Sequence, residues 1–259
     1  MNCLVTKLKE TVADSNLAPF GYSLMDMYIS NGQSVTLISS TKDAIRAITS
    51  DTKVTVSEND FTVENIGSAN RVTVYVKNTI ERVSPNSSSQ DQSVDISNLY
   101  DFLDLVDLSS TGYTNKFRGS ISSVANLTKL KRILTQGNLI TGDLSSLSEL
   151  LDLEDLNMSQ TSIRGDIAKL GKLIKLGSTN AALNDTNIRG AFESFVESLL
   201  KNGASGLKYF SVQRTKVTFN SIAIPEQLEV TFENGTISVA KHSDKSVIGT
   251  YSNGLWSYS

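Results

Sequence analysis

Cysteine, histidine and tryptophan are nearly absent from this chain of 259 residues, each occurring once as Cys3, His242 and Trp256. A single cysteine excludes an internal disulfide framework, so nothing requires an oxidising compartment. Cys3 would need a basic neighbour in space to act as a nucleophile, and its place in an expected first strand favours packing instead. Without paired cysteines or a His-Glu-x-x-His segment, the usual zinc sites are excluded.

Long apolar runs and an excess of one charge are lacking as well. No window approaches the roughly 20 apolar residues of a membrane-spanning helix, and Lys7, Lys9 and Glu10 interrupt any core of a cleaved export signal near the start. The formal net charge is only −3, and the basic residues are dispersed. We therefore expect no membrane contact, no nucleic-acid partner and no cofactor.

What the chain does have is a repeated apolar template. Residues 150–167 read LxxLxxLxLxxTxIxGxI, and residues 127–144 place apolar residues, Asn138 and Gly142 in the same slots without a gap. A fifth copy around Leu207 keeps the spacing, while a first and a fourth copy need short insertions. The glycine slot of the five copies holds Gly119, Gly142, Gly165, Gly190 and Phe219, at intervals of 23, 23, 25 and 29 residues. This period is typical of a solenoid of stacked coils.

One coil is too small to bury its own apolar side, so stacking must build the core. The LxL piece of each coil predicts a short strand with both leucine slots inward, and successive strands should pair in parallel. Short polar side chains in the Asn138 or Thr161 slot can satisfy backbone groups where the coil turns. Leu130, Leu153 and Leu156 are therefore expected in one continuous core.

The segments NxIxGxI and TxIxGxI resemble leucine-rich repeats of the long, plant-type pattern, over roughly Val94 to Ile222. The proline that often follows the glycine in that pattern is missing here, and no cysteines bound the ends. The opening MNCLVTKLK, a β-rich stretch, a Ser-rich joint and TGDL or RGDI repeats are also similar to structural proteins of crAss-like phages and related prophages of gut Bacteroidetes. That resemblance implies a virion component such as a head fibre, a capsid decoration or a tail-associated protein.

The flanks of the repeat predict two further units. Residues 1–83 should form a small β-rich module, with a hairpin at Asn31-Gly32 and a helix over Thr41–Ile48. The polar run 84–93 is expected to be a linker. The solenoid then covers 94–222, and residues 223–259 predict two hairpins with turns at Asn234-Gly235 and Asn253-Gly254. Such hairpins can cap the last coil. The predicted fold class is a β-rich chain with about five parallel coils.

Candidate binding residues are those that should point outward from the parallel strands, a face that solenoids often use for partners. They are Lys131, Arg132, Leu134 and Gln136, then Glu154, Asp155, Asn157 and Ser159, then Lys208, Tyr209, Ser211 and Gln213. Contacts to a cap or to another subunit are expected from Tyr251, Leu255, Trp256 and Tyr258.

Catalytic and metal-binding residues are not expected. His242 lies in a polar segment with no nucleophile elbow elsewhere in the sequence. The acids at 101, 104 and 107 and at 152, 154 and 155 lie between inward leucines, so a solvated face is expected, not a calcium site or a glycosidase pair.

We therefore predict a non-enzymatic structural or interaction protein, assigned to a virion by the phage resemblance. Residues 1–83 would attach to other virion proteins, the solenoid would project as a binding platform or spacer, and homo-oligomers would gain avidity. The first alternative is a bacterial leucine-rich-repeat module that binds a host surface protein or a glycan. The second alternative is a carbohydrate-active enzyme, for which Asp155 and His242 are the residues to replace.

Overall fold

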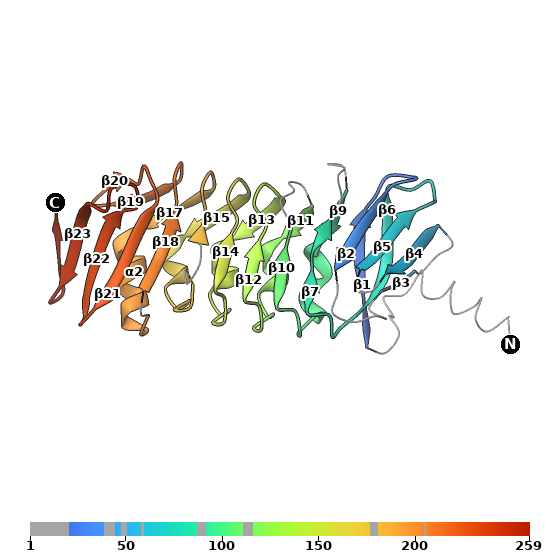
Figure 1. Ribbon diagram of the computed structural model, residues 1–259, viewed down its shortest axis with the longest axis horizontal. Coiled ribbons are helices and arrows are strands. Elements are labelled where there is room, and N and C mark those ends of the chain that lie inside the picture. The colour runs from blue at the N-terminus through green and yellow to red at the C-terminus, as the bar shows by residue number, and fades with distance from the viewer. Residues whose placement is uncertain are drawn as a thin grey trace.

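The protein is an elongated stack of coils, with N-terminal strands at one end and C-terminal hairpins at the other (Figure 1). The computed structural model describes residues 21–38, 45–47, 51–57, 60–86, 92–110, 116–176, 181–204 and 206–259. Cys3 and the opening segment MNCLVTKLK lie outside these residues.

Each coil contributes one strand to each of two ten-stranded sheets. In the first, which we call the front sheet, the coil strands pair in parallel. They are β10 (Asp107–Ser109), β12 (Arg132–Leu134), β14 (Asp155–Asn157), β16 (Ala181–Ala182) and β18 (Gly206–Ser211). The strands of the second, the back sheet, are also parallel. They are β11 (Phe117–Ser120), β13 (Leu139–Asp143), β15 (Ser162–Asp166), β17 (Asn187–Ala191) and β19 (Lys216–Phe219).

The apolar slots of the repeat fill the space between these two sheets. Leu130, Leu153 and Leu156 are completely buried. Ile133, Leu156 and Ala181 lie side by side on successive front-sheet strands, and one apolar cluster continues from Met25 to Val239. Stacking of the leucines into a single core, as the repeat predicts, is confirmed.

A helical turn follows each of the first four coil strands of the back sheet and leads the chain back to the front sheet. These turns are the 3-10 helices η2 (Ile121–Val124), η3 (Leu144–Leu147) and η4 (Ile167–Leu170), and in the fourth coil α2 (Phe192–Lys201). In the first three, the residue after the glycine caps the helix: Ser120, Asp143 and Asp166 each accept a hydrogen bond from the backbone N–H two residues on. The longer helix α2 accounts for the 29-residue spacing, and it buries Phe192, Phe195, Val196 and Leu199.

The N-terminal strands form two sheet layers at one end of the stack. They are β1 (Tyr22–Tyr28), β2 (Ser34–Ile38), β3 (Ile45–Ala47), β4 (Thr52–Ser57), β5 (Asp60–Asn65) and β6 (Arg71–Lys77). Strands β1, β6 and β3 extend the back sheet, while β2, β4 and β5 form a separate four-stranded sheet with β8 (Pro85–Asn86).

The helix predicted over Thr41–Ile48 is wrong for its described part. Ile45–Ala47 is the strand β3, which pairs antiparallel with Val74–Val76 of β6. Helical spacing over eight residues is a weak signal, and pairing with a β-branched neighbouring strand overrides it. Residues 41–44 and Ile48 lie outside the described part of the chain.

The hairpin predicted at Asn31-Gly32 is also wrong, although a turn does lie there. The flanking strands β1 and β2 belong to different sheets, β1 pairing with β6 and β2 with β5. Asn65, at the end of β5, takes the backbone contacts that a hairpin would use. Its carbonyl accepts from Gly32 N–H at 2.8 Å, and its N–H donates to Gln33 O at 3.0 Å. The turn therefore carries the chain from one sheet to the other.

The sequence predicts a linker over 84–93, but the described ends of this segment lie in strands: Pro85–Asn86 is β8, which pairs with β2, and Ser93 begins a strand of the back sheet. Ser84, Gln92 and Ser93 are buried. Strand β7 (Arg82–Val83) extends the front sheet in parallel with β10. Strand β9 (Ser93–Asp95) joins β1 to β11 in the back sheet and leads into the 3-10 helix η1 (Ile96–Asp101).

Side-chain contacts also tie the N-terminal strands to the coils. The Arg118 guanidinium of β11 lies 4.0 Å from the centre of the Tyr28 ring, and Ser23 Oγ donates to Asp101 Oδ2 at 3.1 Å. A separate attachment role for residues 1–83 stays a prediction.

The two C-terminal hairpins are confirmed. Strand β21 (Leu228–Glu233) pairs with β22 (Thr236–Lys241), and β23 (Val247–Ser252) pairs with β24 (Leu255–Tyr258). Strand β21 pairs antiparallel with β18, the front-sheet strand of the last coil. The hairpins therefore extend the front sheet past the last coil. The back sheet ends in the short β20 (Ile222–Ala223).

Candidate functional site

Charged side chains of alternating sign form a row across the outward face of the front sheet. The strand register places Arg82, Asp107, Arg132 and Asp155 side by side on β7, β10, β12 and β14. Asp107 Oδ2 lies 3.4 Å from Arg82 Nε and 3.5 Å from Arg132 Nη1, and Arg132 Nε lies 3.4 Å from Asp155 Oδ2. We call these four residues the charged row.

The charged row corrects one expectation about the acids. Asp107 does not face solvent freely but is only 8% exposed, because it lies between two arginines. Four of the other acids have basic partners on neighbouring coils: Asp104 with Lys129 at 2.6 Å, Asp152 with Lys175 at 2.5 Å, Glu154 with Lys131 and Asp155 with Arg132. Asp101 instead accepts a hydrogen bond from the Ser23 hydroxyl. Ion pairing between coils is therefore observed for these four acids.

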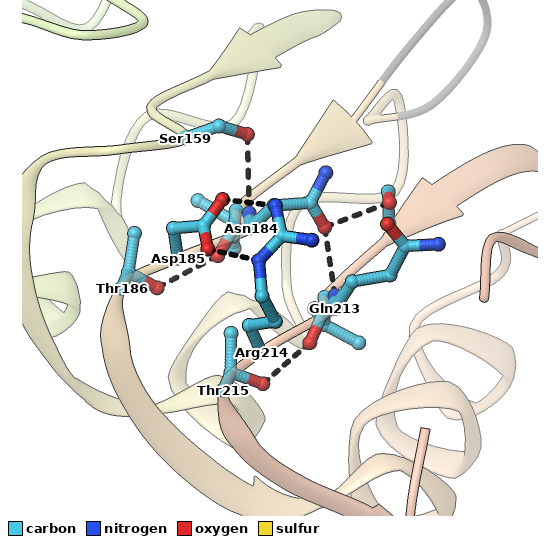
Figure 2. Close-up of polar contacts among 10 residues, drawn as sticks. Ser159, Asn184, Asp185, Thr186, Gln213, Arg214 and Thr215 are labelled. Carbon is cyan, nitrogen blue, oxygen red and sulfur yellow. Dashed lines mark hydrogen bonds and ion pairs between the residues drawn. The ribbon is translucent and has the colours of Figure 1, made fainter. Parts of the chain in front are cut away.

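A second row of polar side chains follows the turns where the coils leave the front sheet. Asn157 Nδ2 donates to Gln136 Oε1 at 3.1 Å and so joins the second coil to the third. Asn184 continues the row, since its Oδ1 accepts from Ser211 Oγ and from Gln213 N–H, both at 2.7 Å (Figure 2). We call Gln136, Asn157, Asn184 and Gln213 the amide row.

Two of the predicted outward residues are buried beneath the amide row. Ser159 is buried, and its Oγ accepts from Asn184 N–H at 3.1 Å (Figure 2). Ser211 is buried by its contact with Asn184. Both side chains are therefore covered by their contacts with Asn184.

The other predicted binding residues are exposed or half-buried where they are described, and their role in binding stays a prediction. Lys131, Arg132 and Gln136 are exposed, and Leu134, Glu154, Asp155, Asn157 and Gln213 are half-buried. Lys208 and Tyr209 lie in β18, and their side chains fall outside the described part of the structure.

The Asn and Thr slots satisfy backbone groups at the turns, as predicted. Asn138 Oδ1 accepts from Phe117 N–H at 2.6 Å, which links the first coil to the second. The hydroxyls of Thr161, Thr186 and Thr215 each donate to the carbonyl three residues before them. Figure 2 shows this contact for Thr186 and Thr215, beside the ion pair of Asp185 with Arg214 on the next coil.

The predicted contact aromatics at the C-terminus cover the end of the stack. The rings of Trp256 and Tyr258 each lie 5.4 Å from the ring of Phe219, centre to centre. Trp256 Nε1 donates to Glu197 Oε1 at 2.5 Å, and the Tyr258 hydroxyl donates to Glu193 Oε1 at 3.1 Å. Tyr251 packs on Trp256, whereas Leu255 remains 74% exposed.

The two residues named for an enzymatic alternative do not come together. Asp155 lies on β14, while His242 follows β22, four positions further along the front sheet. Four strand spacings correspond to roughly 19 Å. His242 Nδ1 is 2.8 Å from Glu229 Oε1, and Asp155 is paired with Arg132. Among the described residues, no three His, Cys, Asp or Glu side chains gather where they could hold a metal ion.

Several surface carboxyls are stabilised in their charged form. The backbone N–H of Ser145 holds the pKa of the Asp143 carboxyl below its usual value. Hydrogen bonds from Lys175, Arg214 and Lys245 lower the pKa of Asp152, Asp185 and Glu229 respectively, and the Ser246 hydroxyl lowers that of Asp244.

These lowered pKa values predict a loss of stability in acid. Carboxyls with a lower pKa in the folded state bind fewer protons there than in the unfolded chain, so unfolding is favoured as pH falls. We expect the urea midpoint to be constant from pH 7 to about 5 and to decline below about pH 4. The decline should be shallower in Asp143→Asn, and a midpoint that holds or rises down to pH 3 would contradict the assignment.

No protein-family model matches the sequence, and no curated protein matches it. Solved structures do resemble it. The complex of PEPR1 with AtPEP1 has a TM-score of 0.43 and 20% identity, over 53% of this chain and 18% of that chain. The leucine-rich-repeat ectodomain of the receptor kinase SOBIR1 from Arabidopsis thaliana has a TM-score of 0.41 and 16% identity, over 56% and 76%.

The Leptospira interrogans leucine-rich-repeat protein LIC12759 has a TM-score of 0.37 and 22% identity, over 46% of this chain and 28% of that chain. The match thus spans less than a fifth of the PEPR1 chain. None of these three is a virion protein, so the similarity to phage structural proteins gains no support from them. The virion location and virion partners stay predictions.

Within the described residues, no helix is both long and apolar enough to cross a membrane. The fold assignment depends on the chain's own geometry. Its template recurs at intervals of 23 to 29 residues, and each coil places one strand in each of two parallel sheets around buried leucines. Together these features identify the coiled part of this chain as a solenoid of the leucine-rich-repeat fold.

Proposed function

We propose that this protein is a non-enzymatic interaction module that binds an extended segment of a partner protein on the outward face of its front sheet. The observation that carries the proposal is the pair of rows on that face. The charged row and the amide row both run across successive coils, fixed by contacts between neighbouring strands. A surface held in this way needs little rearrangement when a ligand binds.

The chemistry of the face favours a ligand of low net charge. Three basic side chains, Arg82, Lys131 and Arg132, face three acidic ones, Asp107, Glu154 and Asp155. Because the charges are balanced, the face has no general attraction for a strongly acidic or strongly basic ligand.

The amide row provides the hydrogen-bonding capacity. Each amide side chain both donates and accepts hydrogen bonds, which suits the alternating N–H and C=O groups of an extended backbone. The half-buried Leu134 lies on the same face of β12 and adds an apolar contact. A polypeptide segment is therefore favoured over a glycan, which remains an outcome of the test below.

If the protein is part of a virion, the binding face proposed above stays the same and only its location is specified further. It would require residues 1–83 to attach to other virion proteins. The structural resemblances reported above do not support that location, so it stays a prediction.

Panning a random peptide display library against the full chain tests the proposal. We expect enriched peptides of low net charge, whose affinity falls at least about tenfold, or roughly 1.4 kcal/mol, in Leu134→Arg. The substitution places a long charged side chain in the middle of the face. The affinity of one synthetic enriched peptide, measured by isothermal titration, provides the comparison.

Leu139→Arg is the matched control. Leu139 belongs to the same coil but lies on β13 of the back sheet, where it is 49% exposed. The affinity of the Leu139→Arg variant for the peptide should therefore stay within about twofold of that of the parent protein. Equal losses in both variants would place binding elsewhere. If no peptide is enriched, and if the protein binds a glycan array and Leu134→Arg abolishes that binding, the ligand of this face is a glycan and not a protein segment.

A further inference from the structure

In the described part of the chain, the last strand of the front sheet, β24, pairs with another strand along one edge only. Strand order places it at the end, beyond β23, β22, β21 and β18. Its register with β23 pairs Ser252 with Leu255 and Thr250 with Ser257. Ser259 N–H donates to Ile248 O at 3.3 Å. In an antiparallel ladder, residues that bond to one neighbour alternate with residues that face away. The backbone groups of Trp256 and Tyr258 therefore point out from the edge.

This edge lacks the features that usually protect edge strands. Proteins commonly place lysine, proline or inward-pointing charges on such strands to prevent pairing with other chains. Between Val247 and Ser259 the sequence contains no proline and no Lys, Arg, Asp or Glu. Leu255 is 74% exposed, on the side of the strand opposite to Trp256 and Tyr258.

The strand is also held firmly in place. Hydrogen bonds from Trp256 to Glu197 and from Tyr258 to Glu193 fix it to α2, and both rings pack on Phe219. The edge is therefore presented in an extended conformation, with little ordering cost left for a strand that joins it.

We propose that β24 pairs antiparallel with β24 of a second copy of this chain, about a two-fold axis through Ser257. With Ser257 opposite its own copy, Trp256 lies opposite Tyr258 of the second copy, and the reverse holds by symmetry. The outward backbone groups of these residues then exchange about four hydrogen bonds. An uncharged edge that is its own complement brings no like charges together.

The side chains agree with this register. Across the joined strands, Tyr251 and Trp256 of one copy are followed by Tyr258 of the second copy. The three aromatic rings lie in one row on the same face of the sheet. Tyr251 and Trp256 already have ring centres 5.5 Å apart within one chain, and cross-strand aromatic pairs stabilise sheets. Counted along the front sheet, β24 lies four strands, or roughly 19 Å, beyond β18, and its Trp256 and Tyr258 rings fold back onto Phe219 of β19.

The test is the mass of the full chain in solution, measured by light scattering during size-exclusion chromatography at about 100 µM, since a small interface associates weakly. The expected mass is near twice the 28.1 kDa of one chain. Ser257→Lys should return the protein to one chain, because the two-fold axis places the two lysines directly opposite each other. Ser257→Glu should do the same.

Mixing the two variants in equal amounts should restore the doubled mass, since lysine then faces glutamate. Ser252→Lys is the matched control: Ser252 is an exposed residue of the same hairpin, paired with Leu255 and away from the axis, so this variant should stay dimeric. A parent protein with the mass of one chain would overturn the proposal. So would a dimer that Ser257→Lys leaves intact, or a mixture of the two variants that stays monomeric.

Discussion

Replacing Leu156 with alanine is expected to lower the free energy of unfolding by about 2 to 5 kcal/mol. The Leu156 side chain is 0% exposed at the centre of β14, and the register places it between Ile133 and Ala181 of the two adjacent coils. Because each coil depends on its neighbours for a core, the cavity weakens two interfaces at once. Urea unfolding followed by circular dichroism measures the change.

Leu151→Ala is the control, because Leu151 belongs to the same coil but is 49% exposed. It should change the free energy of unfolding by less than about 0.5 kcal/mol. A loss of under roughly 0.5 kcal/mol for Leu156→Ala would put this side chain on the surface and contradict the stacked core.

The core could be predicted from the sequence because its signal is local and repeated. Leu130, Leu153 and Leu156 occupy fixed slots of a short template, and every copy of that template adds support for the same assignment. The two C-terminal hairpins were predictable for a similar reason, since Asn-Gly between alternating apolar residues strongly favours a tight turn.

The N-terminal errors arise where distant strands decide the structure. Asn31-Gly32 carries the same turn signal, yet β1 finds its partners at residues 71–77 and 93–94. Arg82–Val83 joins the front sheet only because β10 offers it an edge. Neither pairing can be recognised from the local sequence. The polar residues after position 83 therefore predicted a linker.

The candidate face was partly predictable. Asp107, Arg132 and Asp155 fall in equivalent slots of successive coils, so alternating charge at one slot was a signal for the charged row. The helix α2 was predictable from a different signal, because Phe192, Phe195, Val196 and Leu199 have the spacing of one helix face. Burial of Ser159 and Ser211 was not visible, because it depends on Asn184 reaching across from another coil.

Replacing Gly165 with alanine is expected to lower the free energy of unfolding by roughly 2 to 4 kcal/mol. Its φ of +121° is a backbone conformation that is essentially restricted to glycine. An added Cβ would also lie 2.8 Å from Asp143 Oδ1 of the preceding coil. Since Asp143 caps η3 through the Ser145 N–H, the substitution both strains β15 and displaces a helix cap.

Gly137→Ala separates the two causes. Gly137 also has a positive φ, of 68°, but the equivalent turns place Gln160, Asp185 and Arg214 at φ between 54° and 58°. Alanine should therefore cost only about 1 kcal/mol there. In the double variant Asp143→Ala/Gly165→Ala, the total loss should be smaller than the sum of the single losses, because the cap can be lost only once. A Gly165→Ala loss no larger than that of Gly137→Ala, or strictly additive losses in the double variant, would mean that the close approach of Gly165 to Asp143 does not stabilise the contact between the two coils.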